Sequence, residues 1–239
     1  MTRISRERRF LAGLQVGSSV RKKRCILLMF LLGGMICLVA AQQPPFYNNI
    51  RHFKELDRRE PPPKNAVLFI GSSSFTKWTD VQDYFPEYKI INRGFGGSTL
   101  PDLIYYFNDL VPVYRPRQVV IYCGENDLAN SSTPADSVVA RFKRLYALIR
   151  LYNRRLPVAY ISMKPSPSRS RFLSKFITAN DAIKTFISTQ KYARYISIYE
   201  QMLSPDGNPR PEIFERDHLH MNAAGYQIWQ KEIRPYLKK

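Results

Sequence analysis

Five short apolar runs, separated by longer stretches with helical periodicity, dominate the chain after residue 63. The first, third and fourth runs are almost continuously apolar, as strands covered on both faces are. The runs are Ala66–Ile70, Lys89–Ile91, Val119–Cys123, Val158–Ser162 and Tyr195–Tyr199. Strands that alternate with helices form a parallel sheet, so this pattern predicts an α/β sandwich.

Several of the intervening stretches have the pattern of amphipathic helices. Between the third and fourth runs, apolar residues recur at three- and four-residue steps from Val138 to Tyr152, which predicts a crossover helix. We expect further helices over Leu173–Gln190 and Asn222–Leu237. A short helix over Phe46–Asp57 should end at the prolines that follow it, because proline interrupts helices and stiffens linkers.

The first 41 residues differ from the rest of the chain. Residues 1–24 hold eight Lys or Arg and one acid, and the seventeen residues 25–41 hold no charge. A basic flank before an apolar run is typical of a secretory signal or a membrane anchor. As a helix the run would measure about 25 Å, against roughly 30 Å of bilayer hydrocarbon, so cleavage and anchoring both stay open.

We therefore divide the chain into three parts and expect an exported protein. Residues 1–41 form the basic leader and the apolar signal or anchor, 42–63 a short helix with a Pro-rich linker, and 64–239 one folded domain. The domain would lie in the periplasm or outside the cell, either free or held at the membrane by the anchor.

The net charge of +18 raises the question of a polyanionic partner. Outside residues 1–24 the excess falls to 29 bases against 18 acids, with no dense basic run interleaved with aromatic residues. We therefore expect no nucleic-acid partner, and name residues 25–41 and the basic surface as the candidates for membrane association. No Cys/His cluster has metal-ligand spacing, so no metal site of that kind is predicted. The oligomeric state is left open.

Polar clusters follow the predicted strands. In a parallel α/β sheet, ligands bind at the loops after the carboxyl ends of the strands. The clusters are Gly71–Ser74, Asn92–Ser98, Gly124–Asp127 and, later in the chain, Asp217–His220. Singly, such groups more often cap helices, form turns or make surface ion pairs. Their placement at successive strand ends favours a catalytic site.

Acyl transfer needs a nucleophile, a base and donors for the developing oxyanion. Ser73 follows a strand directly at the start of a helix, where its hydroxyl is exposed. Asp217 and His220 are three residues apart, so on one turn the carboxylate can hold the imidazole. Gly97 can offer an unobstructed backbone N–H, and Asn126 a side-chain amide. Together these residue types favour acyl transfer by a serine nucleophile.

The segments FIGSSS, NRGFGGS, GEND and DHLH occur in the order and context of the four motifs of SGNH (GDSL) esterases and lipases. From Pro63 to Lys239 the chain resembles this family, and most of all acylhydrolases similar to the platelet-activating-factor acetylhydrolase catalytic subunits. The resemblance implies a flavodoxin-like three-layer α/β/α sandwich with a five-stranded parallel sheet, the SGNH hydrolase fold. It also implies no metal and no cofactor.

The same resemblance assigns roles to residues. It implies a catalytic triad of Ser73, Asp217 and His220, and an oxyanion hole formed by Ser73, Gly97 and Asn126. One departure is that Ser72 stands where the family usually has Asp. The neighbouring serines, Ser72 and Ser74, therefore compete with Ser73 as nucleophile, and we keep Ser73 because its spacing from the preceding glycine is preserved.

The base has a competitor, and the substrate is less constrained. His218 also follows Asp217 but would point elsewhere on a helical turn. Phe95, with other aromatic residues, is a candidate wall of the acyl pocket or a core residue. Lys164 and Arg169 follow the fourth run, either as a cationic rim for the substrate or in a solvated loop.

No long apolar lid segment is present, so we expect short acyl esters, for instance acetyl groups on a glycan. The alternatives are a lysophospholipase- or thioesterase-like acylhydrolase and an inactive glycan-binding module of the same fold. We therefore predict a carboxylic ester hydrolase that acts on a small acyl ester or an acylated glycan.

Overall fold

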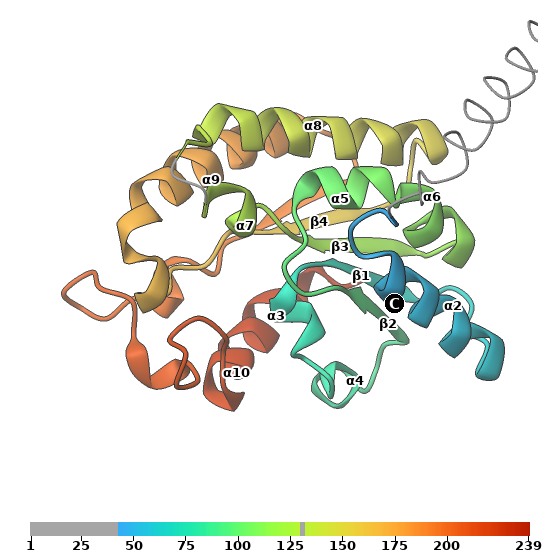
Figure 1. Ribbon diagram of the computed structural model, residues 1–239, viewed down its shortest axis with the longest axis horizontal. Helices are drawn as coiled ribbons and strands as arrows, with labels where there is room; N and C mark the ends of the chain where they lie inside the picture. Colours follow the sequence, from blue (N-terminus) through green and yellow to red (C-terminus); the bar gives the residue numbers. More distant parts are fainter. Residues whose placement is uncertain (1–42, 130–131) are drawn as a thin grey trace, which may run out of the picture. The chain divides into compact units, whose positions relative to one another are not determined.

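A five-stranded parallel sheet forms the centre of the protein, and its strands lie in the order β2-β1-β3-β4-β5 (Figure 1). The computed structural model describes residues 43–129 and 132–239, and Pro45–Lys239 form one compact unit. The strands are β1 (Val67–Gly71), β2 (Ile90–Gly94), β3 (Gln118–Tyr122), β4 (Val158–Ile161) and β5 (Ala193–Ile196). This is the flavodoxin-like order, so the predicted fold class is confirmed.

Alternate residues of the central strands supply two separate cores. In β1, Leu68 and Ile70 belong to one apolar cluster, whereas Val67 and Phe69 belong to the other. The strands β3 and β4 divide their residues in the same way. Burying each large apolar side chain contributes roughly 1.5–3 kcal/mol, which explains why these strands read as continuous apolar runs.

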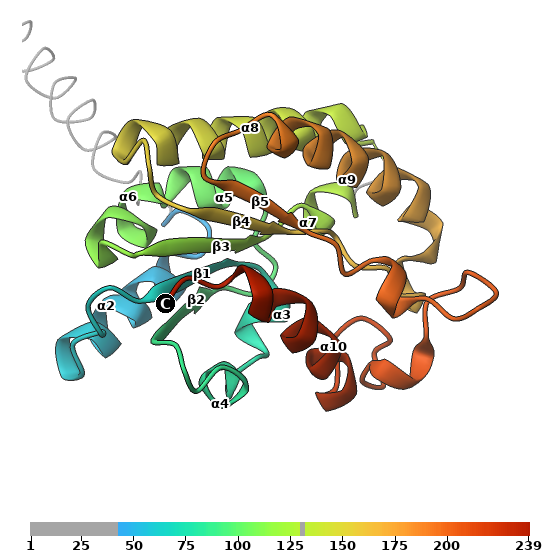
Figure 2. The same cartoon turned by 180° about the vertical axis from the view of Figure 1, so that it is seen from behind.

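Helices cover both faces of the sheet, which Figure 2 shows from behind. The first core packs under α2 (Tyr47–Arg59), α5 (Leu100–Tyr105), α6 (Phe107–Leu110), α8 (Ala135–Tyr152) and α9 (Leu173–Ser188). The second core packs under α3 (Ser73–Thr76), α4 (Val81–Tyr84) and α10 (Ala223–Ile233). The short α7 (Glu125–Leu128) follows β3 directly.

Most element bounds shift by one or two residues from the ranges expected, and two strands and one helix differ more clearly. The strand β5 starts at Ala193 rather than Tyr195, because Ala193 pairs with the first residue of β4. The strand β2 continues through polar residues to Gly94, since its pairing with β1 extends that far. The helix α10 ends at Ile233 and continues as a 3-10 turn, because Pro235 has no amide hydrogen for the helix ladder.

The segment expected to act as a linker is part of the compact unit. Ile50 of α2 is buried in the first core, and the Tyr106 hydroxyl donates a 2.6 Å hydrogen bond to the Pro45 carbonyl. Arg93 of β2 pairs with Asp57, which also accepts a 2.7 Å hydrogen bond from the Tyr114 hydroxyl. A boundary between residues 63 and 64 is therefore wrong: these contacts join α2 to the sheet.

The predicted leader, residues 1–41, lies outside the described residues. Among the helices of residues 43–129 and 132–239, none has the length and apolar character needed to cross a bilayer.

The end of β1 approaches β3 so closely that only glycine fits there. Gly71 has φ +153°, and a Cβ added to it would lie 1.9 Å from the Tyr122 carbonyl oxygen. We expect Gly71→Ala to lower the free energy of unfolding by about 3 kcal/mol or more, because backbone must move. Chemical denaturation monitored by circular dichroism measures this.

Gly207→Ala is the matched control. Gly207 also has a positive φ, +82°, but a Cβ there would meet nothing within 4 Å. Backbone strain alone should cost about 1 kcal/mol. Equal losses in the two variants would contradict the steric explanation at Gly71.

Candidate active site

The first candidate group is the serine cluster after β1. Ser73 is the first residue of α3, and the Ser72 N–H donates to the Tyr122 carbonyl at 3.1 Å. Ser72 and Ser74 are only 3% and 1% exposed, whereas Ser73 is half-buried. Ser73 is therefore the serine of this cluster that a substrate can reach. The main chain of Ser72, which stands where the family usually has Asp, joins β1 to β3.

Hydrogen bonds join the loops after β1, β2 and β3 into one unit. The Gly71 carbonyl accepts from the Phe95 N–H at 2.9 Å and from the Ser98 hydroxyl at 3.1 Å. The Ser98 carbonyl in turn accepts from the side-chain amide of Asn126 at 3.0 Å. Ser73 and Asn126 thus follow β1 and β3, the two strands between which the chain direction across the sheet reverses.

The glycine loop after β2 passes close to the start of α3. A Cβ at Gly96 would lie 3.8 Å from the Ser73 Cβ, and one at Gly97 would lie 3.9 Å from the Phe46 ring. Gly97 is exposed with φ +83°, and its N–H donates to no acceptor in the described part of the chain. The loop therefore passes Ser73 at Gly96, and the next residue, Gly97, has a free backbone donor among the described residues.

Asp217 and His220 are in contact. The His220 Nδ1 lies 2.6 Å from one Asp217 carboxylate oxygen, and the other oxygen accepts from the N–H groups of His220 and Leu219 at 2.9 Å each. Partial burial acts to raise the pKa of Asp217, but these hydrogen bonds outweigh it and hold that pKa well below its usual value.

Because the folded-state pKa of Asp217 is lowered, the stabilisation from its ionised form is present above about pH 4 and is lost as the pH falls further. The carboxylate is therefore ionised throughout the neutral range. It fixes the tautomer in which the second ring nitrogen of His220 is the acceptor.

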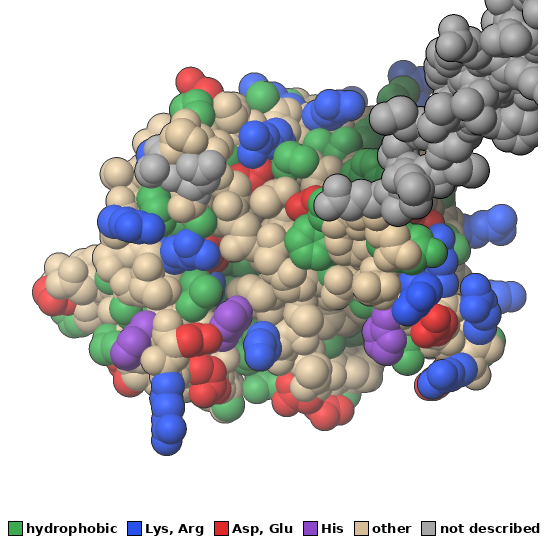
Figure 3. Space-filling model, viewed as in Figure 1, with side chains coloured by type: hydrophobic (Ala, Val, Ile, Leu, Met, Phe, Trp, Pro, Cys, Tyr) green, Lys and Arg blue, Asp and Glu red, His purple; other side chains and the backbone are tan. Residues whose placement is uncertain are grey.

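The Nε2 atom of His220 is buried and makes no hydrogen bond within the described residues. His218, the competing base, is exposed and has the left-handed φ of 54°. Its N–H donates to the Glu215 carbonyl, and its own carbonyl accepts from Ser168. The hydrogen bonds of His218 thus come from its backbone and hold the loop. His220 is the histidine of this loop whose ring is oriented by Asp217. In Figure 3, histidine and acidic side chains lie together next to α10.

The loop that carries Asp217 and His220 is attached to α3, the helix that begins at Ser73, through α10. The Asn222 side chain caps α10 by accepting from the Gly225 N–H at 3.2 Å. The Tyr226 hydroxyl donates to the Ser74 carbonyl at 2.9 Å, and the Trp229 ring packs edge-on against Phe75. The loop with Asp217 and His220 and the helix α3 are therefore held against the same core.

Two expected substrate contacts are wrong. Lys164 is 1% exposed and forms a 2.8 Å ion pair with the buried Glu125, so it belongs to no substrate rim. Phe95 is fully buried, edge-on against Phe46 and Tyr106, so it is a core residue. Arg169 is half-buried in the 3-10 turn Pro167–Phe172 and stays a candidate for substrate contact.

Sequence reasoning missed the buried groups that support Asn126. Glu125, beside Asn126, accepts hydrogen bonds from both Lys164 and the Tyr122 hydroxyl. Burial, followed by the Glu125 charge, raises the pKa of Tyr122 well above its usual value, so it acts as a donor. Asp127 accepts from the Leu100 N–H and from Arg141. A charged residue on either side of Asn126 was the available signal.

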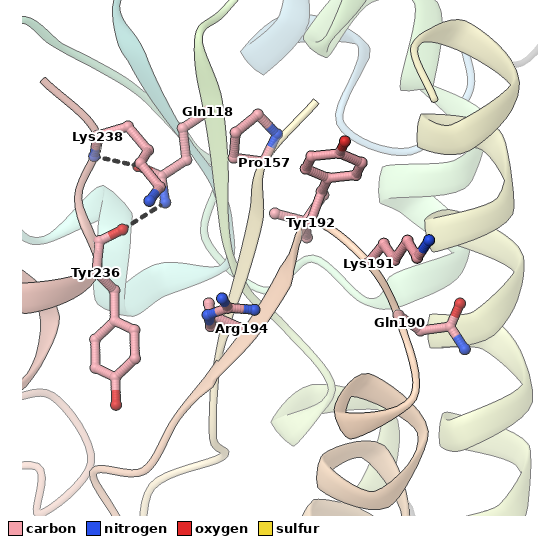
Figure 4. Close-up of a pocket in the computed structure, with 9 residues that line it drawn as sticks. Gln118, Pro157, Gln190, Lys191, Tyr192, Arg194, Tyr236 and Lys238 are labelled. Carbon is pink, nitrogen blue, oxygen red and sulfur yellow. Dashed lines mark hydrogen bonds between the residues drawn. The ribbon is translucent and has the colours of Figure 1, made fainter. Parts of the chain in front are cut away.

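A cavity of about 490 Å³ lies at the opposite edge of the sheet, where the strands begin (Figure 4). Its lining includes Gln118 and Arg194 near the starts of β3 and β5, with Lys191 and Lys238 beside them. It contains none of the predicted catalytic residues, so it is separate from the candidate site. Within the described residues, no group of three His, Cys, Asp or Glu side chains could hold a metal ion.

Comparisons with solved structures find the same fold. A proposed platelet activating factor from Streptococcus pneumonia aligns with a TM-score of 0.71 at 18% identity, over 91% of this chain and 99% of that one. A GDSL-like lipase from Bacteroides thetaiotaomicron gives 0.68 at 21%, over 78% and 96%. An acetyl xylan esterase from Geobacillus stearothermophilus gives 0.58 at 15%, over 74% and 99%.

A curated sequence relative is an N-acylneuraminate cytidylyltransferase from Escherichia coli O18:K1:H7, 23% identical over 198 residues. The match covers 82% of this chain but 46% of that protein, so the chain spans about half the length of its curated relative.

The family model of the GDSL-like lipases and acylhydrolases matches residues 69–228, which include every strand from β2 to β5 and most of β1. The match contains Ser73, Gly97, Asn126, Asp217 and His220. The chain therefore belongs to the GDSL-like lipase/acylhydrolase family.

Proposed function

We propose that this protein is a serine esterase that hydrolyses short acyl esters, acetyl esters among them. The observation that carries the proposal is the hydrogen bonding of the two ring nitrogens of His220. Its Nδ1 is held by Asp217, while its buried Nε2 has no acceptor or donor within the described residues. An imidazole oriented in this way is ready to take a proton from a serine hydroxyl.

In the proposed reaction, Ser73 Oγ attacks the ester carbonyl carbon as its proton passes to His220 Nε2. The carbonyl electron pair moves to oxygen, and the resulting oxyanion accepts hydrogen bonds from the N–H groups of Ser73 and Gly97 and from Asn126. The C–O bond to the alcohol then breaks, and the alcohol leaves with the His220 proton. Water repeats the sequence on the acyl enzyme, which releases the acid and restores Ser73.

A small acyl group is supported by the surroundings of the nucleophile. The side chains of Phe95 and Phe75 are buried in the two cores rather than arranged around a long apolar tunnel. The acetyl xylan esterase that shares the fold also acts, by its name, on acetyl groups. The alternatives are a lysophospholipase- or thioesterase-like activity and a binding module without activity. Assays with esters of increasing chain length separate them, since a binding module would hydrolyse none of the esters.

Our first prediction for this site concerns nucleophile and base. Ser73→Ala and His220→Ala should each lower kcat/KM for p-nitrophenyl acetate by about 10³-fold or more, because the two act as one unit. The matched controls, Ser74→Ala and His218→Ala, should keep most of the activity. Absorbance assays of p-nitrophenol release measure the activity of the folded variants and of the controls. Full activity in Ser73→Ala would contradict the assignment of Ser73 as nucleophile. Loss of activity in His218→Ala, with activity kept in His220→Ala, would mean that His218 is the base.

A second prediction concerns the oxyanion donor. Asn126→Ala should lower kcat roughly 10²–10³-fold with little change in KM, since the donor acts mainly in the transition state. Because the Asn126 amide also bonds to Ser98, thermal unfolding of the variant serves as control for loop disorder. An effect confined to KM would mean that Asn126 binds the ground-state substrate instead.

We further propose that the protein is exported, on the basis of the basic leader and the uncharged residues 25–41. If a signal peptidase cleaves the chain, the mature protein should begin near Gln42, after the small residues Val39–Ala41. Mass spectrometry of protein from the native cell envelope tests this, with a full-length membrane-bound chain as the anchored outcome. An intact chain in the soluble cytoplasmic fraction would refute export in either form.

A further inference from the structure

The two edges of the sheet carry opposite charge. At the amino edge, where the strands begin, the segments 60–66, 85–89, 111–117, 151–157, 189–193 and 234–239 hold ten Lys or Arg and two Glu. At the carboxyl edge, the segments 72–80, 95–99, 123–129, 132–134, 162–172 and 197–222 hold six Lys or Arg and eight Asp or Glu. The basic excess of the folded unit is therefore concentrated opposite the candidate active site.

The basic side chains at the amino edge are free of ion pairs in the described part of the chain, apart from Arg234, which pairs with Glu87. The others are all exposed. They are Lys64, Lys89, Arg115, Arg117, Arg154, Arg155, Lys191, Lys238 and Lys239, joined by Arg194 at the start of β5. Such unpaired charge on one face produces a directed positive field.

Hydrogen bonds hold these segments together. Arg150, near the end of α8, donates to the carbonyls of Leu156 and Tyr192, which precede β4 and β5. The Gln118 side chain donates to the Tyr236 carbonyl and accepts from the Lys238 N–H, both at 2.8 Å. Figures 1 and 2 both show the ends of α6 and α8 at the same end of the molecule as the chain's C-terminus. The basic residues therefore form one surface.

Two adjoining cavities open within this surface. One, of about 490 Å³, includes Lys191, Arg194 and Lys238 in its lining, with the Tyr192 ring beside them (Figure 4). The other, of about 370 Å³, shares Lys238 and adds Lys64, among other basic side chains. Recesses lined by cations can accept anionic groups that project from a partner surface.

Exposed apolar side chains also lie at the amino edge, and they distinguish a membrane from a dissolved polyanion as the partner. Leu151 is 83% exposed, Val113 61% and Tyr192 48%, and they precede β4, β3 and β5. A dissolved polyanion gains nothing from contact with leucine or valine. A bilayer surface takes both, because phosphate groups pair with Lys and Arg while apolar and tyrosine side chains enter the headgroup region.

We propose that the amino edge of the sheet is a docking surface for anionic phospholipid membranes. Docking through this edge turns the carboxyl edge, with Ser73 and His220, away from the bilayer and toward soluble or polymeric esters. The proposal does not depend on the catalytic assignments, because it rests on the opposite edge and its test measures binding alone.

The test is sedimentation of the full chain with phosphatidylcholine vesicles, with and without about a quarter of phosphatidylglycerol. We expect the anionic lipid to raise the partition coefficient at least about tenfold at low salt, and about 1 M salt to remove that increase, because the Debye length falls to about 3 Å. Residues 1–24, with eight Lys or Arg, and residues 25–41 are present in every sample, so the comparison between variants that all keep them decides whether the amino edge carries the increase. Equal binding to both vesicle types would overturn the proposal.

Charge-neutralised variants locate the surface. One variant replaces four exposed basic residues of the amino edge: Arg154→Gln, Arg155→Gln, Lys191→Gln and Lys239→Gln. Its matched control replaces four exposed basic residues elsewhere: Lys77→Gln, Arg144→Gln, Arg171→Gln and Lys184→Gln. A basic residue beside an anionic membrane strengthens binding roughly fivefold, so only the first variant should lose at least about tenfold. Equal losses in both would mean that net charge alone drives binding, and would overturn the assigned surface.

Leu151→Ser separates a membrane from a soluble polyanion. The side chain is almost fully exposed, so the substitution should leave folding intact. We expect it to weaken vesicle binding several-fold without changing the salt dependence, because it removes only the apolar contact. Unchanged vesicle binding, together with salt-sensitive binding to dextran sulfate, would replace the lipid surface with a soluble polyanion as partner.

Discussion

The close contact between the end of β1 and the Tyr122 carbonyl is the constraint on which the site depends. Gly71 alone permits it, since a Cβ would lie 1.9 Å from that oxygen. The same residue offers its carbonyl to both Phe95 and Ser98, which set the glycine loop. Ser73, the proposed nucleophile, begins its helix two residues later, so it and the glycine loop take their positions from one backbone junction.

Behind that junction, buried charge fixes the third loop. Lys164 and Glu125 form an ion pair with side chains 2% and 6% exposed, to which the Tyr122 hydroxyl adds a hydrogen bond. Desolvation offsets much of the attraction in such a pair, so its net contribution to stability is small. Removing one partner would nevertheless leave an unpaired charge next to Asn126. The pair therefore contributes most by fixing where α7 begins.

The parallel sheet separates chemistry from surface charge. Because its central strands are buried on both faces, polar groups can gather only where strands begin or end. The carboxyl edge holds the serine, the imidazole and the amide donors with a slight excess of acids. The amino edge holds unpaired Lys and Arg together with exposed Leu151 and Tyr192. In our proposals, the same fold thus carries a reaction at one end and a membrane contact at the other.

The sequence by itself determined the sheet, most helix ranges and the motif residues, because apolar periodicity and local spacing such as that of Asp217 and His220 are properties of neighbouring positions. Only the tertiary structure decided which residues are accessible. Lys164 and Phe95 look like site residues in the chain, but Glu125 and Phe46, distant in sequence, bury them. The packing of α2 against the sheet likewise depends on segments far apart in the chain, and so does the clustering of basic residues at the amino edge. Burial and charge clustering are sums over long-range contacts, which no local pattern encodes.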